Sequence, residues 1–562
     1  MSYSKFKRNL KKEYRDNFSE PKKKFEFKLP FFKIKYAILL LVIILIGCLG
    51  IEHLAVKNYN HQVETMYNDL SSKKLDKVQG TFDIKNDKPS FKQSIFEKIG
   101  AFFKSVSSTK SADDNIYDAP DAPGNSDSNS SYETNVQVSG IDEADIAKSD
   151  GKYIYSLYTN HKLLVVFDLN CRIIDQTQTQ ASNLFLYENK IIAIGKNILS
   201  IYSFEETSLS LVWQRKNLNY LDSRLVDSNL FFIYSTKVPD NFSTGVTYCD
   251  NFYGNYNFDT KILRLNLDDL DFKEVDLLVY RSLVVYMSNE HIYICSSTLA
   301  FDYYQVSVIS IFDYDLRPIG AVRLRGTILN QFSLDEYAGN LRVVATDTYE
   351  EACHLNSISI YNLDSLDRVG YLNENIGLDR QIVKSVSFDR DKCYIVTYQN
   401  TDPFYELDIS DSTHPKIVSS YQAPGYSSYL YSFKIDDEEY VLGLGVLDDR
   451  NTPKISIYHN GIQIGKDYII SIQFIDNFNY GMFSNHKALF IYNDGKYLYL
   501  GTTTYLFETY TIFKIDVSSD DVVSVYKEVD LNVKSNFKDS RAFLIDGILY
   551  ITADLEVVKE NL

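Results

Sequence analysis

The sequence is poor in the residues that mark several common protein classes. Its 562 residues include a single tryptophan, Trp213, and only six cysteines, none of which form a C-x-x-C pair. A disulfide framework or a structural zinc site needs closely spaced or evenly paired cysteines, so we expect neither. We expect small buried thiols, with one incidental disulfide as the alternative. The cysteines are Cys48, Cys171, Cys249, Cys295, Cys353 and Cys393.

Common catalytic motifs are also absent. The eight histidines are scattered, with no H-E-x-x-H pair, and the chain has no G-x-S-x-G elbow, phosphate-binding loop or dinucleotide fingerprint. Function has to be argued from a site, and none of these sites is visible. The sequence therefore favours a binding protein over an enzyme. Carboxylates that converge from distant segments are the alternative route to a hydrolase or lyase.

The charge is divided unevenly along the chain. The net charge is −17, but residues 1–35 carry twelve basic and four acidic residues, which leaves −25 for the remainder. A strongly negative domain repels phosphate backbones, so nucleic-acid binding is not expected. Residues 1–35 are predicted to be a basic cytoplasmic tail.

An apolar segment follows the basic tail. Sixteen residues from Tyr36 to Ile51 carry no charge, and residues 36–56 form the predicted transmembrane segment. The positive-inside rule places the N-terminus in the cytoplasm and the C-terminal part outside the cell. We predict an uncleaved signal-anchor. Cleavage and acylation at Cys48, in the lipobox-like sequence LIGC, is the alternative. Either way the protein is a single-pass or lipid-anchored membrane protein.

Residues 57–132 are predicted to be a stalk and a linker. Their first part mixes charged and apolar residues, as expected of a short helix or neck. Ser, Asp, Asn and Pro then dominate, a composition that cannot bury enough apolar surface to offset the entropy of ordering. This segment would hold the following domain, residues 133–562, clear of the membrane.

That domain contains a repeat. An apolar–polar–apolar element, usually with Asp or Asn at its centre and followed by a polar turn, recurs eight times at intervals of 35 to 63 residues. The strands before these elements are apolar on both faces, as in KYIYSLY (152–158), whereas a sandwich strand would alternate. Strands of this kind are typical of propeller blades, which neighbouring blades cover on both sides. The elements centre on Asp168, Ser203, Asn266, Asp313, Asn362, Asp408, His459 and Asp516.

We therefore predict an all-β fold, a β-propeller of eight blades, with seven as the alternative. A last strand pair between Ala542 and Ala553 has no complete element of its own. We expect it to join the strand at 152–158 in one shared blade, which would close the ring. The insertion at 237–260 would form a loop on one rim.

Three motifs resemble a known family. The stretch ETNVQVSGIDEADIAKSDGKYIY, from Glu133 to Tyr155, is similar to the opening motif of exported bacterial and archaeal proteins with a C-terminal β-propeller, distantly related to WD-type propellers. Residues 402–416 and 424–430 are similar to later motifs of that family. The chain departs from the pattern at 458–461, where YHNG replaces a second turn of the D-x-S-D-P type. The resemblance implies a fold and an exported location, and it carries over no settled catalytic activity.

Two segments are candidate sites. Asp142, Glu143, Asp145 and Asp150 are a possible Ca²⁺ site, because hard cations prefer several carboxylate oxygens, although the spacing does not match an EF-hand. Hydrogen bonds within turns are the alternative role for these acids. The second segment is a tyrosine-rich loop, a composition typical of adaptable recognition surfaces. Its candidate binding residues are Tyr248, Phe252, Tyr253 and Tyr256.

Together these features predict an extracellular binding or scaffolding module for a protein, a peptide or a glycan. A hydrolase or lyase with carboxylates in the propeller channel is one alternative. A structural protein of the cell envelope is another.

Overall fold

A computed structural model of the chain describes most of its C-terminal part. All of these residues belong to the second of two compact units, which spans Leu70–Leu562. The described ranges are 134–237, 246–247, 258–278, 282–299, 305–347, 355–377, 381–398, 402–447, 452–470, 481–483, 485–504, 509–531 and 540–562.

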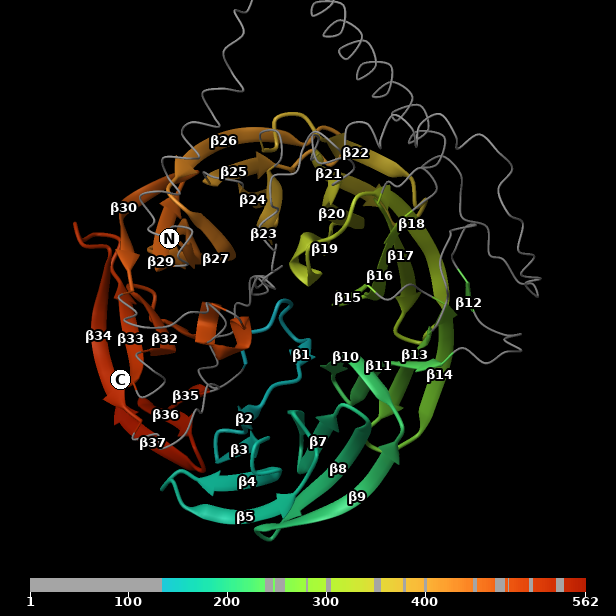
Figure 1. Cartoon of the computed structure of the whole chain (residues 1–562), viewed down its shortest axis with the longest axis vertical. Helices are drawn as coiled ribbons and strands as arrows, with labels where there is room; N and C mark the ends of the chain where they lie inside the picture. Colours follow the sequence, from blue (N-terminus) through green and yellow to red (C-terminus); the bar gives the residue numbers. More distant parts are fainter. Residues whose placement is uncertain are drawn as a thin grey trace, which may run out of the picture. The chain divides into compact units, whose positions relative to one another are not determined.

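The described residues form nine sheets around a central axis (Figure 1), numbered here as blades 1 to 9 in chain order. Blade 1 comprises β2 (Ala147–Ser149), β3 (Tyr153–Tyr158), β4 (Leu163–Asp168) and β5 (Ile173–Gln178). Blade 2 comprises β6 (Asn183–Tyr187), β7 (Lys190–Gly195), β8 (Ile198–Glu205) and β9 (Ser208–Lys216). Blade 3 comprises β10 (Asn219–Val226), β11 (Asn229–Lys237), β13 (Phe258–Asn266) and β14 (Phe272–Leu278), with β1 (Asp142–Glu143) and β12 (Val246–Thr247) at its edges.

The next three blades have four strands each. Blade 4 comprises β15 (Ser282–Met287), β16 (His291–Leu299), β17 (Gln305–Asp313) and β18 (Pro318–Arg325). Blade 5 comprises β19 (Leu334–Tyr337), β20 (Asn340–Asp347), β21 (Leu355–Asn362) and β22 (Arg368–Leu372). Blade 6 comprises β23 (Ile382–Asp389), β24 (Lys392–Tyr398), β25 (Asp402–Asp408) and β26 (Lys416–Ala423).

The last three blades complete the ring. Blade 7 comprises β27 (Tyr426–Ile435), β28 (Glu438–Val446), β29 (Pro453–His459) and β30 (Ile462–Ile469). Blade 8 comprises β31 (Phe490–Asn493), β32 (Leu498–Thr504), β33 (Thr509–Ile515) and β34 (Val523–Asp530). Blade 9 comprises β35 (Ala542–Ile545), β36 (Ile548–Ala553) and β37 (Glu556–Asn561).

Burial along each blade follows the order of its strands. In the second strand β20 every residue but the first is buried, and the third strand β17 is buried throughout its interior. The fourth strand β26 instead alternates exposed and half-buried side chains, and such strands lie at the outside of the ring in Figure 1. The expectation that inner strands are apolar on both faces is confirmed, because each inner strand packs between two neighbouring blades.

The blades adhere through nine clusters of buried apolar side chains among the described residues, and each cluster joins two adjacent sheets. One of these clusters closes the ring. It joins Ile154 and Phe167 of blade 1 to Phe543 and Tyr550 of blade 9. Closure thus rests on side-chain packing between the first and last blades.

The prediction of eight blades, with seven as the alternative, is wrong. The eight repeat elements mark the third strands of blades 1 to 8, and blade 9 was missed because β37 has no element of this kind. The last strand pair does not share a blade with 152–158 either. The short β2 pairs with β3 and supplies the innermost strand of blade 1. Blade 1 is therefore complete without the last strand pair.

The recurring Asp or Asn has a structural reason. Asp408 Oδ1 accepts hydrogen bonds from the backbone N and the Oγ of Ser410, at 3.0 and 2.6 Å. Asp516 holds Ser518 in the same way. These contacts turn the chain sharply after the third strand. At 460–461, where the motif departs, Asn460 and Gly461 both have positive φ (50° and 73°), the geometry of a two-residue hairpin.

Short 3₁₀ helices place two polar side chains near the axis. η1 (Gln331–Ser333) precedes β19, and η3 (His486–Ala488) precedes β31; η2 spans Gly481–Phe483. The Asn330 and Asn485 side chains cap η1 and η3 by accepting backbone N–H bonds. Gln331 and His486 are both buried as a result.

Candidate functional site

The segment before blade 1 lies inside the ring (Figure 1). Its strand β1 pairs with β10, the innermost strand of blade 3. Asn135 Nδ2 donates to the Tyr429 hydroxyl of blade 7 at 2.8 Å, and Gln137 Nε2 donates to the carbonyl of Leu334 in blade 5 at 3.2 Å. Residues 134–146, called here the axial segment, therefore contact blades on several sides of the channel.

Glu143 is the most heavily bonded side chain of the axial segment. Its Oε2 lies 3.1 Å from His486 Nε2, its Oε1 accepts a 3.0 Å hydrogen bond from Gln331 Nε2, and Arg224 Nε lies 4.0 Å away. Burial favours the neutral carboxyl, but the Arg224 and His486 charges outweigh it, so the pKa of Glu143 lies well below its ordinary value. Glu143 thus joins blades 3, 5 and 8 as a buried anion.

The other three predicted acids have separate partners. Asp145 forms a two-point ion pair with Arg541, at 2.7 and 2.8 Å. Asp142 Oδ1 accepts a 2.6 Å hydrogen bond from Lys148 Nζ. Asp150 accepts the backbone N–H groups of the turn into β3, as the alternative interpretation expected.

The structure therefore does not bring Asp142, Glu143, Asp145 and Asp150 together as one ligand set. Among the described residues, one group of three His, Cys, Asp or Glu side chains has ligand atoms that all converge, and it lies elsewhere. The acids of the opening motif fix the axial segment to the blades instead.

A cavity of about 1090 Å³ opens at one end of the channel. Its floor includes most of residues 134–139 of the axial segment, and its wall is built from blades 4 to 9. Most wall residues lie where the first strand of a blade ends and the second begins. Aromatic and amide side chains line it beside charged ones; they include Tyr337, Phe388, Tyr431, Tyr492, Asn289 and Asn493.

Charges in the cavity wall occur largely as pairs. Arg342 binds Asp335 and also lies over the rings of Tyr337 and Phe388, at 4.9 and 5.1 Å from their centroids. Lys434 lies 3.6 Å from Glu439 and is exposed on β27. The wall is thus polar, mixed in sign and interrupted by aromatic faces, which suits a ligand with both polar and apolar groups.

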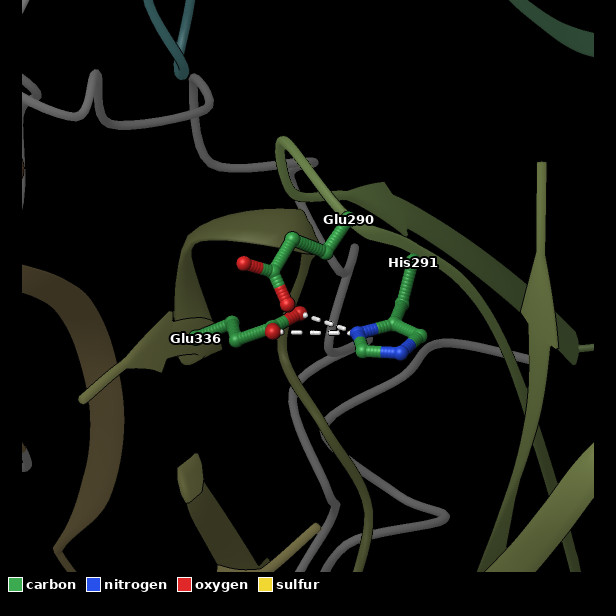
Figure 2. Close-up of side chains that lie close together, drawn as sticks. All are labelled: Glu290, His291 and Glu336. Atoms are coloured by element: carbon green, nitrogen blue, oxygen red, sulfur yellow. Dashed lines mark hydrogen bonds and ion pairs between the residues drawn. The ribbon is translucent and has the colours of Figure 1, made fainter. Parts of the chain in front are cut away.

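One cluster on the cavity rim combines an imidazole with two carboxylates (Figure 2). Glu290 and His291 lie at the turn from β15 to β16 in blade 4, and Glu336 lies on β19 in blade 5. One ligand atom from each of the three lies within 4.8 Å of the others. His291 Nδ1 is 3.0 Å from both Glu336 oxygens.

Neighbouring hydroxyl groups hold this cluster in place. Ser288 Oγ donates to Glu336 and accepts the backbone N–H of His291 at 2.9 Å. The Tyr293 hydroxyl also donates to Glu336, at 2.5 Å, and burial together with this carboxylate raises the pKa of Tyr293 well above its ordinary value. The tyrosine therefore stays protonated and remains a donor.

No sequence pattern indicates this cluster, because a single Glu-His pair and a glutamate 45 positions later match no spacing motif. The partners of the axial segment, Arg224, His486 and Arg541, were missed for the same reason. The predicted binding residues Tyr248, Phe252, Tyr253 and Tyr256 lie outside the described residues, and so does Cys48. The predicted membrane segment 36–56 also lies outside them, and no helix of the described part has the length and apolar character needed to cross a bilayer.

The chain belongs to the family described as Beta propeller domain, which matches residues 131–229 and 216–562. This confirms the resemblance stated from the opening motif. An uncharacterized protein of Archaeoglobus fulgidus is 26% identical, over 76% of this chain and 83% of that protein. An uncharacterized protein of Methanocaldococcus jannaschii is 25% identical, over 57% of this chain and 68% of the relative.

Solved structures are similar to this chain only at a low level. Apo AztD from Citrobacter koseri is 11% identical, over 70% of this chain and 94% of that one, with a TM-score of 0.36. The propeller of the Trilobed protease from Pyrococcus furiosus is 12% identical, over 49% and 78%, with a TM-score of 0.26.

Proposed function

We propose that this propeller is an extracytoplasmic binding module that captures a segment of a protein, a peptide or a glycan at the mouth of its channel. The observation that carries the proposal is the cavity of about 1090 Å³ walled by blades 4 to 9. Ligand sites are typically concave and of roughly 300–1,000 Å³, so this cavity has room for a short polymer segment.

The cavity wall supports recognition of such a segment. Its paired charges keep their orientation without a ligand, because each pair fixes both partners. Its aromatic faces offer area that buries apolar or sugar surface at low cost in conformational entropy. The tyrosine-rich loop that contains Tyr248, Phe252, Tyr253 and Tyr256 is proposed as a second contact with the partner.

The proposal includes the membrane topology and cellular location of the module. Residues 36–56 would span the cell membrane as a signal-anchor, residues 1–35 would lie in the cytoplasm, and residues 57–132 would carry the propeller outside. Protease treatment of intact cells tests this topology: the propeller should be cleaved or released while a tag before residue 36 stays protected. The intact mass of the mature protein separates the signal-anchor from acylation at Cys48.

Ligand capture is tested with a photo-crosslinking amino acid in the full chain, purified from membranes in detergent. Placed at Lys434, an exposed cavity residue on β27, it should yield a reproducible adduct. Placed at Leu211, exposed on the outer strand β9 of blade 2, it should not. When the crosslinker is placed at another cavity position, the additional change Lys434→Trp should abolish its adduct by filling the cavity. The change Leu211→Trp should leave that adduct unchanged. Equal crosslinking at both positions would contradict the proposal.

One observation favours the alternative of a hydrolase. Glu290 and Glu336 offer oxygens within 4.8 Å, near the ~5–5.5 Å separation of the carboxyl groups in retaining glycosidases. However, Glu336 already interacts with Ser288, Tyr293 and His291. A carboxylate held by three partners is better suited to a binding role than to nucleophilic attack. We therefore favour binding. Glycan cleavage by the wild-type chain that is lost in Glu290→Gln would replace this proposal.

A further inference from the structure

We infer that Glu290, His291 and Glu336 form a binding site for a first-row divalent transition metal such as Zn²⁺. The three side chains converge from two adjacent blades at the rim of the cavity (Figure 2). The site is separate from the acids of the opening motif. All three ligands come from the chain itself, so the site can form without a polymer in the cavity.

The separations between the three ligand atoms are close to those in a metal site. Zn²⁺ binds imidazole nitrogen and carboxylate oxygen at about 2.0–2.2 Å, which places tetrahedral ligand atoms roughly 3.4 Å apart. The three ligand atoms lie within 4.8 Å of one another, and His291 Nδ1 and Glu336 are already 3.0 Å apart. Glu290 is exposed, so rotation of its side chain closes the remaining distance.

The donor set decides the class of metal. An imidazole together with two carboxylates suits zinc and its first-row neighbours, whereas Ca²⁺ takes six to eight oxygens and Mg²⁺ favours oxygen in octahedral geometry. Three protein ligands leave at least one coordination position open. Glu290 and Glu336 both line the cavity, so an open position has access to it.

The surroundings of the cluster already meet a requirement of metal sites. Ligating carboxylates are normally held by further hydrogen bonds, which fix their orientation. Ser288 Oγ and the Tyr293 hydroxyl both donate to Glu336, and the Glu336 backbone N donates to the Tyr286 hydroxyl at 3.0 Å. Ser288 Oγ also accepts the backbone N–H groups of Glu290 and His291. One serine thus aligns both halves of the site.

The site joins two blades, which gives metal binding a structural effect. Glu290 and His291 belong to blade 4, and Glu336 belongs to blade 5. A metal held only by the folded state stabilises it by mass action. Zinc should therefore raise the melting temperature of the full chain, and the rise should grow with the logarithm of the free zinc concentration above the dissociation constant.

The experiment measures Zn²⁺ binding to the full chain in detergent, after removal of bound metal with a chelator, by isothermal titration calorimetry and elemental analysis. We expect one Zn²⁺ per chain, an increase in melting temperature, and a visible Co²⁺ spectrum of tetrahedral type. His291→Ala and Glu290→Gln should each weaken binding at least tenfold and abolish the thermal shift. His161→Ala should change neither, because His161 is an exposed histidine whose partner is the single carboxylate of Asp554.

Glu290→Gln keeps the test valid if other variants misfold, because Glu290 is exposed on a turn and its removal leaves the Glu336 hydrogen bonds intact. Failure of the wild-type chain to bind Zn²⁺, or equal affinity in the wild type, His291→Ala and Glu290→Gln, would overturn the inference. Crosslinking at Lys434 is unaffected by either result, so the cavity proposal stands or fails separately.

Discussion

Asp145 and Arg541 lie 396 positions apart in the sequence and form a two-point ion pair, at 2.7 and 2.8 Å, between the axial segment and the start of blade 9. Their side chains are 3% and 4% exposed. The pair ties the segment that enters the ring to the blade that closes it. The axial segment therefore acts as a structural part of the ring.

Loss of one partner of this pair should be strongly destabilising. Arg541→Met leaves the Asp145 carboxylate buried without its cation, and breaking a buried pair costs about 3–5 kcal/mol. Arg172→Met is the matched control, because Arg172 is 71% exposed in its pair with Asp168 and such surface pairs contribute at most about 1 kcal/mol. Urea unfolding of both variants measures the difference. Equal losses in the free energy of unfolding would contradict the prediction that the buried pair stabilises the fold more than the surface pair.

Glu143 should make stability depend on pH in the acid range. Its pKa in the folded protein lies below the reference value of 4.5, so its ionised form stabilises the fold above that pH. This contribution is lost as the pH falls through the lower folded pKa. The free energy of unfolding of the wild type should thus exceed that of Glu143→Gln at pH 7, and the gap should narrow below about pH 4.5.

Glu528→Gln provides the control for this measurement, because Glu528 is an exposed glutamate on the outer strand β34. We expect its difference from the wild type to stay small from pH 7 to the acid limit of folding. A constant gap for Glu143→Gln over the same range would contradict the assigned role of Glu143.

Blade 9 should matter to the whole ring although it has only three strands. Ile551 is fully buried on β36 and packs toward blade 8. Ile551→Ala should cost about 2–5 kcal/mol through lost burial and the cavity that it leaves. Ile462→Ala, at a side chain 57% exposed on β30, should stay within about 0.5 kcal/mol. If blade 9 were peripheral, limited proteolysis of Ile551→Ala would release it and leave blades 1 to 8 intact.

The three described cysteines are free thiols and should differ in reactivity. Burial raises the pKa of the Cys295 thiol to about 12, and Cys393 is also fully buried, whereas Cys171 is only half-buried. The thiolate is the reactive form, so a maleimide should label Cys171 first in the native protein. Peptide mass mapping checks the order, and denaturant should equalise the three. Early labelling of Cys295 would show that blade 4 opens readily.

The class of fold could be predicted from the sequence because it depends on local patterns. Strands apolar on both faces, with an Asp or Asn turn after the third strand, identify a propeller blade by blade. The count failed at blade 9, whose strands β35 and β36 are as apolar as their counterparts but whose third strand, β37, is largely polar and lacks the repeat element. The contact between the first and last blades could not be predicted from the sequence either. Ile154 and Tyr550 pack in one cluster, but packing between residues so far apart produces no periodic pattern in the sequence.

The amino-acid pattern alone establishes the class of fold, the negative charge of the domain and the similarity of the stretch Glu133–Tyr155 to a family motif. Composition and short-range periodicity carry this information, since strand burial and turn capping act over a few residues. The roles of the charged residues become visible only once the chain is folded. Glu143 and Asp145 pair with buried cations more than eighty positions away, because a closed ring places the inner strands of distant blades around one axis. Glu336 meets His291 because blades 4 and 5 are neighbours.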